Sequence, residues 1–383
     1  MHKKIALFGS TGSIGVQSLE VIRQFPELFQ VEVLTAFSNL ELFRNQILEF
    51  NPTHVVIPDE NKAGTLRTML GDHPVQIHFG QDALKDQAAQ ANYDILIAAI
   101  VGFAGLASTW EAVQRGKIIA LANKETLVVA GDLVRTKVLE SGARLIPVDS
   151  EHSALFQCLI GEDPSRVEKI TLTASGGPFL GKKPNFLINV KKDHALQHPN
   201  WTMGAKITID SASLMNKGLE MIEAKWLFGM SNEQIEVIIH PQSIVHSFVH
   251  FTDGSVKAQL GLPDMKLPIQ YALGYPERLS NNHKRYEIKN YPSLTFEVAD
   301  TKTFRNLALA KEAMYRGGNS PCVLNAANEV VVEAFLKNRI GFLEMSDIIE
   351  QCLERMTFIE HPTMDDYIHT DLETRKLAST LYK

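Results

Sequence analysis

Short apolar runs alternate with longer amphipathic stretches through the first 150 residues of the chain. The apolar runs are KIALFGS, VEVLTAF, HVVIPD, YDILIAAIVG, KIIALAN and ARLIPVDS, and segments of helical periodicity separate them. Strands separated by crossover helices pair in parallel, and ligands bind at their carboxyl ends. We therefore expect an α/β fold in which residues 1–150 form a doubly wound, Rossmann-like parallel sheet.

The pattern changes after residue 150. Strand-like runs RVEKITLTAS, IEVIIHP, SIVHSFVHF and SVKAQLG accompany one long helical stretch, TIDSASLMNKGLEMIEAKWLFG. An Asp253-Gly254 pair between the last two runs predicts a hairpin turn. We expect residues 151–290 to form a central α+β domain.

The last part of the chain has only helical periodicity. The amphipathic segments are FRNLALAKEAMYRG, VLNAANEVVVEAFLKN and MSDIIEQCLERM, followed by a helix near the C-terminus. Residues 291–383 are expected to form a helical domain that supports the rest or contributes to a dimer contact.

Composition narrows the class of partner. The chain has 383 residues, a net charge of -6 and 45% hydrophobic residues, which is typical of a globular protein and unfavourable for nucleic-acid binding. No apolar run of membrane-spanning length and no leader sequence is found, so no membrane association is expected. Three widely spaced cysteines predict neither disulfides nor a thiolate zinc site and fit a reducing cytoplasm.

A glycine-rich segment, GSTGSIG at residues 9–15, follows the first strand and opens a helical stretch. Glycines let the backbone approach a pyrophosphate, and a helix N-terminus offers free N–H groups to the anion. The spacing GxxGxxG differs from the commonest dinucleotide fingerprint. Nucleotide binding is the first interpretation, and a glycine-rich turn without a ligand is the alternative.

The end of the second strand bears on which nucleotide binds. NAD sites usually have an acidic residue there for the ribose 2′-hydroxyl, but this chain has Phe37, Ser38 and Asn39. No carboxylate would repel a 2′-phosphate, so the sequence favours NADP.

The stretch VDSEHSA, residues 148–154, places two acids close together after an apolar run. If it is an extended strand, Asp149 and Glu151 point one way and Ser150 the other. Two neighbouring carboxylates favour a divalent metal, and the alternative is an exposed polar strand end.

A second polar cluster follows Thr208. We expect a helix that begins with Asp210 and Ser211 as N-cap residues and forms an anion site. Ser213, Asn216, Lys217 and Glu220 then share a face, suited to a phosphate beside a metal; a surface Lys217–Glu220 ion pair is the alternative.

Together the acids Asp149, Glu151 and Glu220 would suit Mg²⁺ or Mn²⁺, with Co²⁺ as a further candidate. The evenly spaced His240, His246 and His250 are interpreted as structural rather than as zinc ligands.

The loop QHPNWTMGAK, within residues 196–206, carries large apolar side chains among polar ones. His198, Trp201 and Met203 predict a lid that closes over a substrate. A loop packed on the domain surface is the alternative.

Taken in order, these motifs resemble those of 1-deoxy-D-xylulose 5-phosphate reductoisomerases along essentially the whole chain. They are GSTGSIG, LANKETLV, PVDSEHSA, TASGGPF, HPNWTMGAKITIDSASLMNKGLEMIEA, IHPQSIVHS and LNAANEVVVEAFL. The resemblance implies a homodimeric cytoplasmic enzyme that uses NADPH and a divalent metal to rearrange and then reduce a sugar phosphate, giving 2-C-methyl-D-erythritol 4-phosphate for isoprenoid synthesis. Residues 1–150 would bind NADPH.

The resemblance also implies roles for single residues. Asp149, Glu151 and Glu220 would bind the metal and, with Lys124, act in catalysis. The substrate would contact Lys124, Ser150, Glu151, Glu220, His198 and Trp201, and its phosphate Ser175, Ser211, Asn216 and Lys217. NADPH would contact Thr11, Gly12, Ser13 and Ile14 at the pyrophosphate, Phe37, Ser38 and Asn39 at the adenosine, and Asn123, Glu125 and Gly204 near the nicotinamide.

One departure from the family concerns the adenosine end. The family often has a glycine at position 37 and a basic residue at 38, where this chain has Phe37 and Ser38; Arg44 is a candidate replacement. Two other functions stay open on the residues alone: a non-catalytic NADP-binding regulator, and a metal-free NADP dehydrogenase of a phosphorylated or amino-acid-derived aldehyde. Metal dependence separates the last from the reductoisomerase.

Overall fold

The computed structural model describes residues 2–80, 82–197, 201 and 203–382. The chain forms two compact units, each assembled from separate segments. Unit 1 comprises Met1–Thr126, Val134–Ser153 and Met265–His283, and unit 2 comprises Leu127–Leu133, Ala154–Asp264 and Lys284–Lys383.

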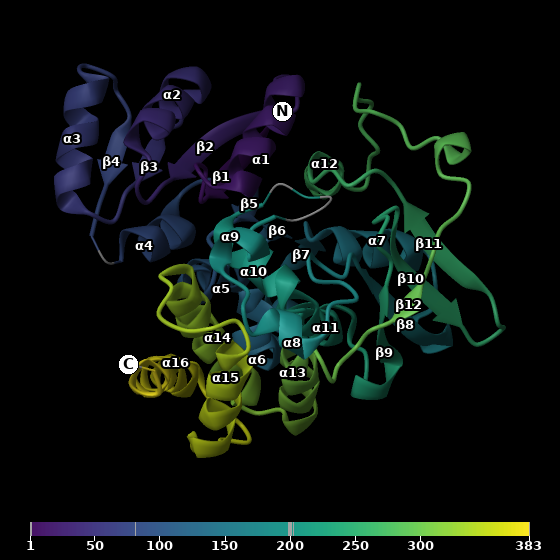
Figure 1. Ribbon diagram of the computed structural model, residues 1–383. Helices are drawn as coiled ribbons and strands as arrows, with labels where there is room; N and C mark the ends of the chain where they lie inside the picture. The colour runs from purple at the N-terminus through teal and green to yellow at the C-terminus, as the bar shows by residue number, and fades with distance from the viewer. Residues whose placement is uncertain (1, 81, 198–200, 202, 383) are drawn as a thin grey trace. The chain divides into compact units, whose positions relative to one another are not determined.

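A parallel sheet forms the centre of unit 1 (Figure 1). Among the described residues it has seven strands in the order β4-β3-β2-β1-β5-β6-β7, and all its pairings are parallel. The strands are β1 (Lys3–Phe8), β2 (Phe29–Thr35), β3 (His54–Val56), β4 (Gln76–His78), β5 (Ile95–Ala98), β6 (Ile118–Leu121) and β7 (Arg144–Pro147). The order reverses between β1 and β5, so the predicted doubly wound sheet is confirmed.

Helices follow the strands of unit 1 along the chain, and α12 joins them from a later segment. They are α1 (Ser13–Gln24), α2 (Leu40–Phe50), α3 (Glu60–Leu70), α4 (Ala83–Gln90), α5 (Leu106–Gln114) with the short η1 (Phe103–Gly105), α6 (Glu125–Ser141) and α12 (Lys266–Gly274). Side-chain caps fix two of these starts, since Asn39 accepts from Leu42 N and Asp59 from Lys62 N. The later segment α12 packs against α1, although the sequence pattern placed it in the central domain.

The acidic stretch after β7 is a helix start. The prediction of an extended strand over residues 148–154 is wrong, because α7 runs over Ser150–Leu159. Asp149 Oδ1 accepts from Glu151 N at 3.2 Å, and Ser153 N donates to Asp149 O at 2.8 Å. Asp149 therefore acts as the N-cap, which an alternating pattern does not reveal.

A mixed sheet forms one part of unit 2, with the order β11-β10-β8-β9-β12 in the described residues. Its strands are β8 (Val167–Ala174), β9 (Ile235–Ile239), β10 (Val245–Phe251), β11 (Val256–Leu260) and β12 (Glu297–Val298). The predicted hairpin is confirmed: β10 and β11 are antiparallel, and Gly254 in the turn has φ +85°. Short 3₁₀ turns η2 (Pro164–Arg166), η3 (Asn232–Gln234) and η4 (Ile288–Asn290) lie between elements.

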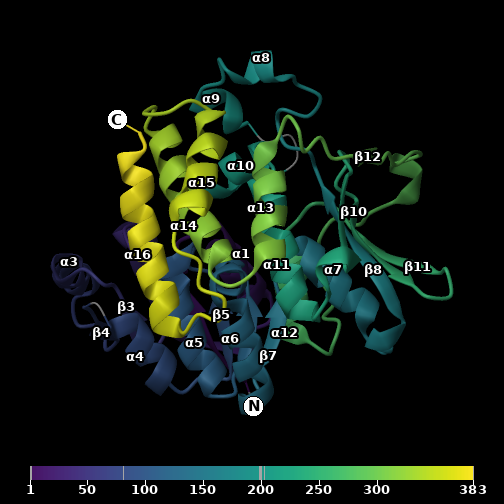
Figure 2. The same ribbon diagram turned by 90° about the horizontal axis from the view of Figure 1, so that it is seen from below.

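Helices make up the rest of unit 2, and Figure 2 shows α13 to α16 side by side. The helices are α8 (Pro184–Leu187), α9 (Lys192–Ala195), α10 (Ala205–Ala212), α11 (Met215–Phe228), α13 (Arg305–Arg316), α14 (Ser320–Leu336), α15 (Glu344–Arg355) and α16 (Met364–Thr380). Sheet residues such as Leu172 and C-terminal residues such as Val331 belong to one buried core. The predicted central and C-terminal domains thus share a core, whereas the sequence pattern separated them.

The polar cluster after Thr208 differs from its prediction. Asp210 and Ser211 do not start a helix but lie in the last turns of α10, and α11 begins after Leu214. Leu214 is buried and has φ +61°, a left-handed conformation that is rare for leucine. The helical periodicity continues across this break, so the sequence predicted one helix where the structure has two.

Among the described residues, no helix combines the length and the apolar character that crossing a bilayer requires.

Candidate functional site

The glycine-rich loop lies between β1 and α1, at the point where the strand order reverses (Figure 1). Gly9 N donates to Thr35 Oγ1 at 2.8 Å, and Ser10 Oγ donates to Gln46 Oε1 at 2.7 Å. These bonds tie the loop to β2 and α2. Gly12 is the N-cap residue of α1 and is exposed, so the loop presents the free N–H groups of a helix start at the expected ligand edge of the sheet.

Two glycines of this loop are required by close packing. A Cβ on Gly15 would lie 2.2 Å from Gly9 O, and Gly9 has φ +95° with a Cβ position 2.7 Å from Ala99 O. A Cβ on Gly12 would meet Gly9 O only at 3.4 Å. A methyl group at Gly12 would therefore make only an ordinary contact within the protein, so internal packing does not require glycine at this position.

The residues at the end of β2 are exposed, and none is acidic. The predicted adenosine contacts Phe37, Ser38 and Asn39 follow one another there, and the Asn39 side chain caps α2. Arg44, the suggested replacement for the family's basic residue, donates from Nε to Met69 O at 2.9 Å. Its guanidinium is thus engaged with the end of α3.

Lys124 and Asp149 form a nearly buried ion pair in unit 1. Lys124 Nζ lies 2.5 Å from Asp149 Oδ2, and their side chains are 7% and 10% exposed. Lys124 follows β6 and Asp149 follows β7, and these strands are parallel neighbours. Because the carboxyl ends of parallel strands meet at one edge, residues 25 positions apart are brought together.

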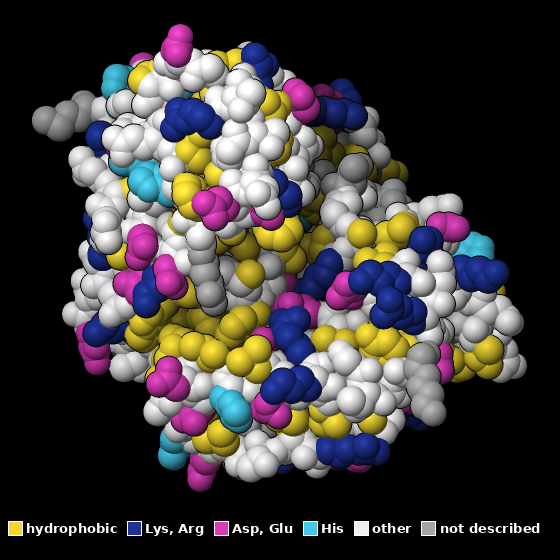
Figure 3. Space-filling view, turned by 90° about the vertical axis from the view of Figure 1, so that its left-hand side faces the viewer, with side chains coloured by type: hydrophobic (Ala, Val, Ile, Leu, Met, Phe, Trp, Pro, Cys, Tyr) yellow, Lys and Arg dark blue, Asp and Glu magenta, His cyan; other side chains and the backbone are white. Residues whose placement is uncertain are grey.

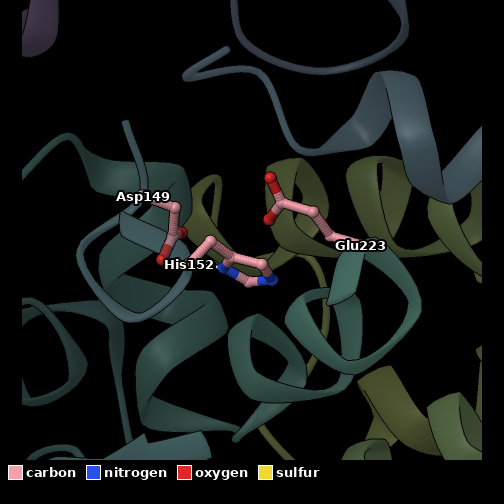
Figure 4. A group of neighbouring side chains, drawn as sticks. All are labelled: Asp149, His152 and Glu223. Carbon is pink, nitrogen blue, oxygen red and sulfur yellow. Dashed lines mark hydrogen bonds and ion pairs between the residues drawn. The ribbon is translucent and has the colours of Figure 1, made fainter. Parts of the chain in front are cut away.

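Asp149 also organises the first turn of α7. Its Oδ1 accepts from Glu151 N, and His152 Nδ1 lies 3.3 Å from the same oxygen (Figure 4). Ser150 Oγ donates to Glu151 Oε2 at 2.7 Å. The carboxylates of Asp149 and Glu151 therefore stay near the helix start. Glu223, the third side chain in Figure 4, belongs to α11 of unit 2.

The predicted nicotinamide contacts Asn123 and Glu125 flank Lys124 and are buried. Asn123 Nδ2 donates to Ile100 O and, at 2.9 Å, to Gly102 O, and its Oδ1 accepts from Thr126 N. Asn123 thereby joins the loop after β5 to the start of α6. It positions the neighbouring Lys124 backbone, a role that the sequence motif did not reveal.

Asn216, Lys217 and Glu220 meet on one face of α11 in unit 2. Asn216 Nδ2 and Lys217 Nζ donate to the two oxygens of Glu220. The side chains of Lys217 and Glu220 are 5% and 1% exposed. Three of the four residues predicted to share a face do so, whereas Ser213 lies at the end of α10. The alternative of a surface ion pair is wrong because this pair is buried.

Two further phosphate candidates, Ser175 and Ser211, lie on segments that touch each other. Ser175 is in the loop after β8, and its Oγ accepts from Gly177 N at 3.2 Å. A Cβ on Gly177 would lie 2.7 Å from Ser211 O at the end of α10. Gly177 has φ +68°, so a glycine allows this loop to approach α10 closely.

Asp210 is held by two elements of unit 2. It pairs with Lys206 at 2.9 Å and accepts a hydrogen bond from Asn328 Nδ2 at 2.8 Å. Asn328 lies on α14, in the segment that the sequence predicted to be supporting. Asp210 therefore anchors α10 to the C-terminal helices. In the sequence, this contact could have been predicted only from polar residues on the apolar faces of the two helices.

The predicted lid is described only in part. His198 lies outside the described residues. Trp201 is half-buried, with its ring edge-on to His246 at 6.5 Å between centroids. Gly204 is exposed and is the N-cap of α10. The position of a lid over a substrate stays a prediction.

The interpretation of His240 as structural agrees with its contacts. The ring stacks on Phe296, its Nδ1 lies 2.9 Å from Thr295 O, and its Nε2 accepts from Ile244 N. Burial lowers the pKa of His240, against the opposing effect of the Thr295 carbonyl. The ring is thus favoured in its neutral form and joins β9 to two nearby segments.

Charged side chains of both signs are intermingled on the face drawn in Figure 3. This distribution fits a net charge of -6 better than it fits a continuous basic surface for a phosphate backbone.

Each unit separately offers carboxylate oxygens of the kind that a hard divalent ion takes. Asp149 and Glu151 in unit 1 and Glu220 in unit 2 are carboxylates, and each unit pairs one acid with a lysine ammonium. Carboxylate oxygens are the ligands that Mg²⁺ and Mn²⁺ prefer. The loop at β1 likewise fits a pyrophosphate.

Family models match most of the chain. The model of 1-deoxy-D-xylulose 5-phosphate reductoisomerase matches residues 5–131, and two models of the C-terminal domain of this enzyme match residues 145–228 and 260–377. The enzyme of that name from Phocaeicola vulgatus is 56% identical over 381 residues, which is 100% of this chain and 99% of the relative. The enzyme from Caldanaerobacter subterraneus is 51% identical over 381 residues, 99% of each chain.

Solved structures agree with these matches. A crystal structure of DOX-P reductoisomerase in complex with NADPH, fosmidomycin and magnesium has a TM-score of 0.94 and 40% identity, covering 99% of this chain and 98% of that one. The Zymomonas mobilis enzyme in complex with NADPH has a TM-score of 0.92 and 40% identity, covering 100% and 99%.

Proposed function

This chain belongs to the 1-deoxy-D-xylulose 5-phosphate reductoisomerase family, and from that premise we infer its activity. It converts 1-deoxy-D-xylulose 5-phosphate to 2-C-methyl-D-erythritol 4-phosphate by rearrangement and reduction, with NADPH and a divalent metal. The reaction belongs to isoprenoid biosynthesis without mevalonate. One observation carries this inference: a single parallel sheet holds the nucleotide loop at its switch point and the Lys124–Asp149 pair at neighbouring strand ends.

We propose that the pyrophosphate of NADPH binds at the start of α1, to Thr11, Gly12, Ser13 and Ile14. The helix start at Gly12 and the partial or full exposure of all four residues support this. Asn123 and Glu125 would lie near the nicotinamide, with Gly204. When bound, NADPH supplies the hydride for the reduction step.

We propose Asp149, Glu151 and Glu220 as the metal ligands. The set draws on both units, so the proposal rests on the family motifs and on how each unit holds its own acids. The cap geometry of Asp149 and the bond from Ser150 to Glu151 fix two of the acids at one helix start. When bound, the metal supplies Lewis-acid stabilisation of developing negative charge on substrate oxygens.

Lysine ammonium groups beside these acids have defined tasks in the proposal. Lys124 and Lys217 place a positive charge beside Asp149 and Glu220 in nearly buried ion pairs. Lys124 and Glu151 are the candidates to hold or move a proton near the substrate. His198 and Trp201 are proposed to cover the substrate from the lid.

The substrate phosphate is proposed to bind Ser175, Ser211, Asn216 and Lys217. These groups offer hydroxyl, amide and ammonium donors, and the loop of Ser175 touches α10 at Ser211. Binding at a remote phosphate fixes the reacting part of a sugar in place.

The activity is tested by following NADPH oxidation with 1-deoxy-D-xylulose 5-phosphate, with and without Mg²⁺, and identifying the product. We expect turnover with Mg²⁺, loss of turnover on chelation and a branched product. Turnover that persists after chelation would support the metal-free NADP dehydrogenase instead. NADPH binding without any turnover would support a non-catalytic regulator.

We propose that the chain forms a homodimer through the sheet of unit 2. Large apolar side chains stand exposed on its edge strands and the adjoining η4: Val298 is 91% exposed, Ile288 76% and Val256 50%. Val256 and Val298 lie on opposite edge strands of this sheet, and exposed apolar side chains on edge strands are candidates for pairing with another chain.

We propose the cytoplasm as the location of the enzyme. Cys158, Cys322 and Cys352 are free and buried, and burial raises the pKa of the Cys352 thiol to about 11. Unreactive free thiols fit a reducing compartment, in which NADPH also stays in its reduced form.

A further inference from the structure

A lysine that no sequence motif singled out lies at the end of β2. Lys62 is on α3, 25 residues beyond Phe37, and its Nζ donates to Phe37 O at 3.0 Å. The same ammonium lies over the Phe37 ring, 4.7 Å from its centroid. The carbonyl and the ring therefore hold a positive charge where the strand ends.

The ammonium of Lys62 lacks a counter-charge of its own. In residues 2–80, 82–197, 201 and 203–382, no carboxylate forms an ion pair with Lys62, and its Nζ bonds to a carbonyl instead. Asp59, the nearest acid in the sequence, uses Oδ1 to cap the backbone N–H of Lys62. Neither the carbonyl nor the aromatic ring that holds this ammonium carries a negative charge, so the ammonium can still pair with an anion.

The position matches the group that distinguishes NADPH from NADH. In doubly wound sheets, the end of the second strand meets the adenosine ribose. The segment here has no carboxylate, Ser38 has no charge, and Asn39 caps α2. Arg44, the one basic residue between positions 36 and 45, donates to Met69 O. Lys62 is thus the cation presented at this strand end.

We propose that Lys62, positioned by the carbonyl and ring of Phe37, binds the 2′-phosphate of NADPH and determines the preference of this enzyme for NADPH over NADH. This rests on the proposed function, since it presumes that the nucleotide binds at the β1 loop. Phe37 and Lys62 together replace the glycine and basic residue that the family often has at positions 37 and 38. Phe37 is a positioning residue, because its carbonyl and ring hold the ammonium.

The test measures equilibrium binding of NADPH and NADH to the full-length protein, without substrate. Lys62→Ala should raise the Kd of NADPH about tenfold to thirtyfold, the loss expected for one charge-assisted phosphate contact, and change the Kd of NADH less than about twofold. Lys62→Arg should keep most of the preference for NADPH over NADH. Phe37→Ala should reduce the ratio of the two Kd values about threefold.

Arg44→Ala is the matched control, since Arg44 is the other cation of this region. The ratio of the two Kd values should stay within about twofold of the unchanged protein. Added salt should weaken NADPH binding more than NADH binding, and Lys62→Ala should remove that difference.

Three results would overturn the assignment: an unchanged Kd for NADPH in Lys62→Ala, an equal loss for both nucleotides, or a preference that depends on Arg44. Should Lys62→Ala fail to fold, Lys62→Gln gives the same readout. If the unchanged protein turns over substrate with NADPH, a negative Lys62 result rejects only this inference; absence of NADPH turnover rejects the proposed function itself.

Discussion

Asp149 has several neighbours, and each constrains it differently. Lys124 pairs with its Oδ2, while Oδ1 accepts from the backbone N–H of Glu151 as a helix cap and lies beside His152 Nδ1. Asp149 has a structural role as a helix cap and a proposed catalytic role, so a test of catalysis needs a substitution that preserves the cap. Asparagine keeps the capping oxygen and replaces the other oxygen, which accepts from Lys124, by an uncharged amide group.

Asp149→Asn should reduce turnover roughly a thousandfold, since the several kcal/mol of metal stabilisation would be lost. The Kd of NADPH should stay within about twofold, because the nucleotide loop is at β1. Steady-state kinetics and NADPH titration measure the two effects. Loss of NADPH binding would mean that Asp149 is chiefly structural.

Lys217→Gln tests the proposed phosphate site. The glutamine amide can still donate to Glu220, but the positive charge is gone, so KM for the substrate should rise about tenfold or more with a smaller change in kcat. Lys225→Gln on the same helix is the control, since the Lys225 ammonium donates to Met314 O. An unchanged KM in Lys217→Gln removes it from the phosphate site.

At the scale of elements, the termini of helices and strands carry the chemistry. The starts of α1, α6 and α7 follow β1, β6 and β7. Each is placed at the carboxyl edge of the sheet by the parallel pairing alone. A substitution at one of these termini can therefore affect the stability of the fold or the binding of a ligand. The space around the residue indicates which effect to expect.

The loop glycines illustrate the two effects. Gly15→Ala should lower the free energy of unfolding by more than about 2 kcal/mol, because its methyl group would overlap the Gly9 carbonyl. Gly12→Ala should fold normally yet weaken NADPH binding, since its methyl group would enter the proposed pyrophosphate site. Gly64→Ala, in α3 with open space around it, is the control and should stabilise by about 0.5 kcal/mol. Denaturant unfolding and NADPH titration compare the three; normal NADPH affinity in Gly12→Ala would contradict the proposed pyrophosphate site.

The connection from β9 to η4 and β12 should be sensitive to pH through His240. Burial lowers the pKa of His240 from its ordinary value of 6.5, so the unfolded chain binds a proton more readily than the folded one. The stabilising contribution is therefore complete above about pH 6.5 and is lost as the pH falls through the lower folded pKa.

His240→Gln should thus show a smaller loss of stability between about pH 7 and pH 5 than the unchanged protein. Urea unfolding at the two pH values measures the difference. His78 and His250, whose pKa values burial also lowers, contribute equally to both proteins. An identical pH dependence would contradict this role of His240.

At the scale of the whole molecule, the residues of the proposed active site come from both units, and the residues of the proposed dimer interface come from unit 2. Unit 2 holds the acid Glu220, the phosphate candidates and the exposed apolar edge strands around a core that includes the C-terminal helices. The C-terminal helices therefore help to hold the central part of unit 2, since Asn328 on α14 donates a hydrogen bond to Asp210 on α10.

Val298→Asp should weaken the proposed dimer by at least about tenfold, because a charge would be buried against the partner. Sedimentation over a range of concentrations measures the change. Leu139→Asp, at a residue 78% exposed on α6 of unit 1, should leave the assembly unchanged. A monomeric unchanged protein, or a dimer unaffected by Val298→Asp, would contradict the proposed interface.

The local sequence pattern predicted an element correctly where residues within that element alone decided its structure. The apolar runs of β1 and β2 and the Asp253-Gly254 turn were predictable because alternation and turn chemistry act within a few residues. The short β4, with the sequence Gln-Ile-His, was missed since its pattern is weak. The start of α7 was misread because a capping acid and a strand acid look alike in sequence.

The sequence by itself determined most of the strand and helix order of the parallel sheet, the glycines of the nucleotide loop and the acids and lysines available to the site. Only the tertiary structure decided which of them meet: Lys124 with Asp149 through adjacent β6 and β7, Asp210 with Asn328 through helix packing, and Lys62 with Phe37 at the end of β2. The physical reason is that composition and periodicity act over a few residues, whereas the burial and pairing of a charge depend on elements far apart in the chain.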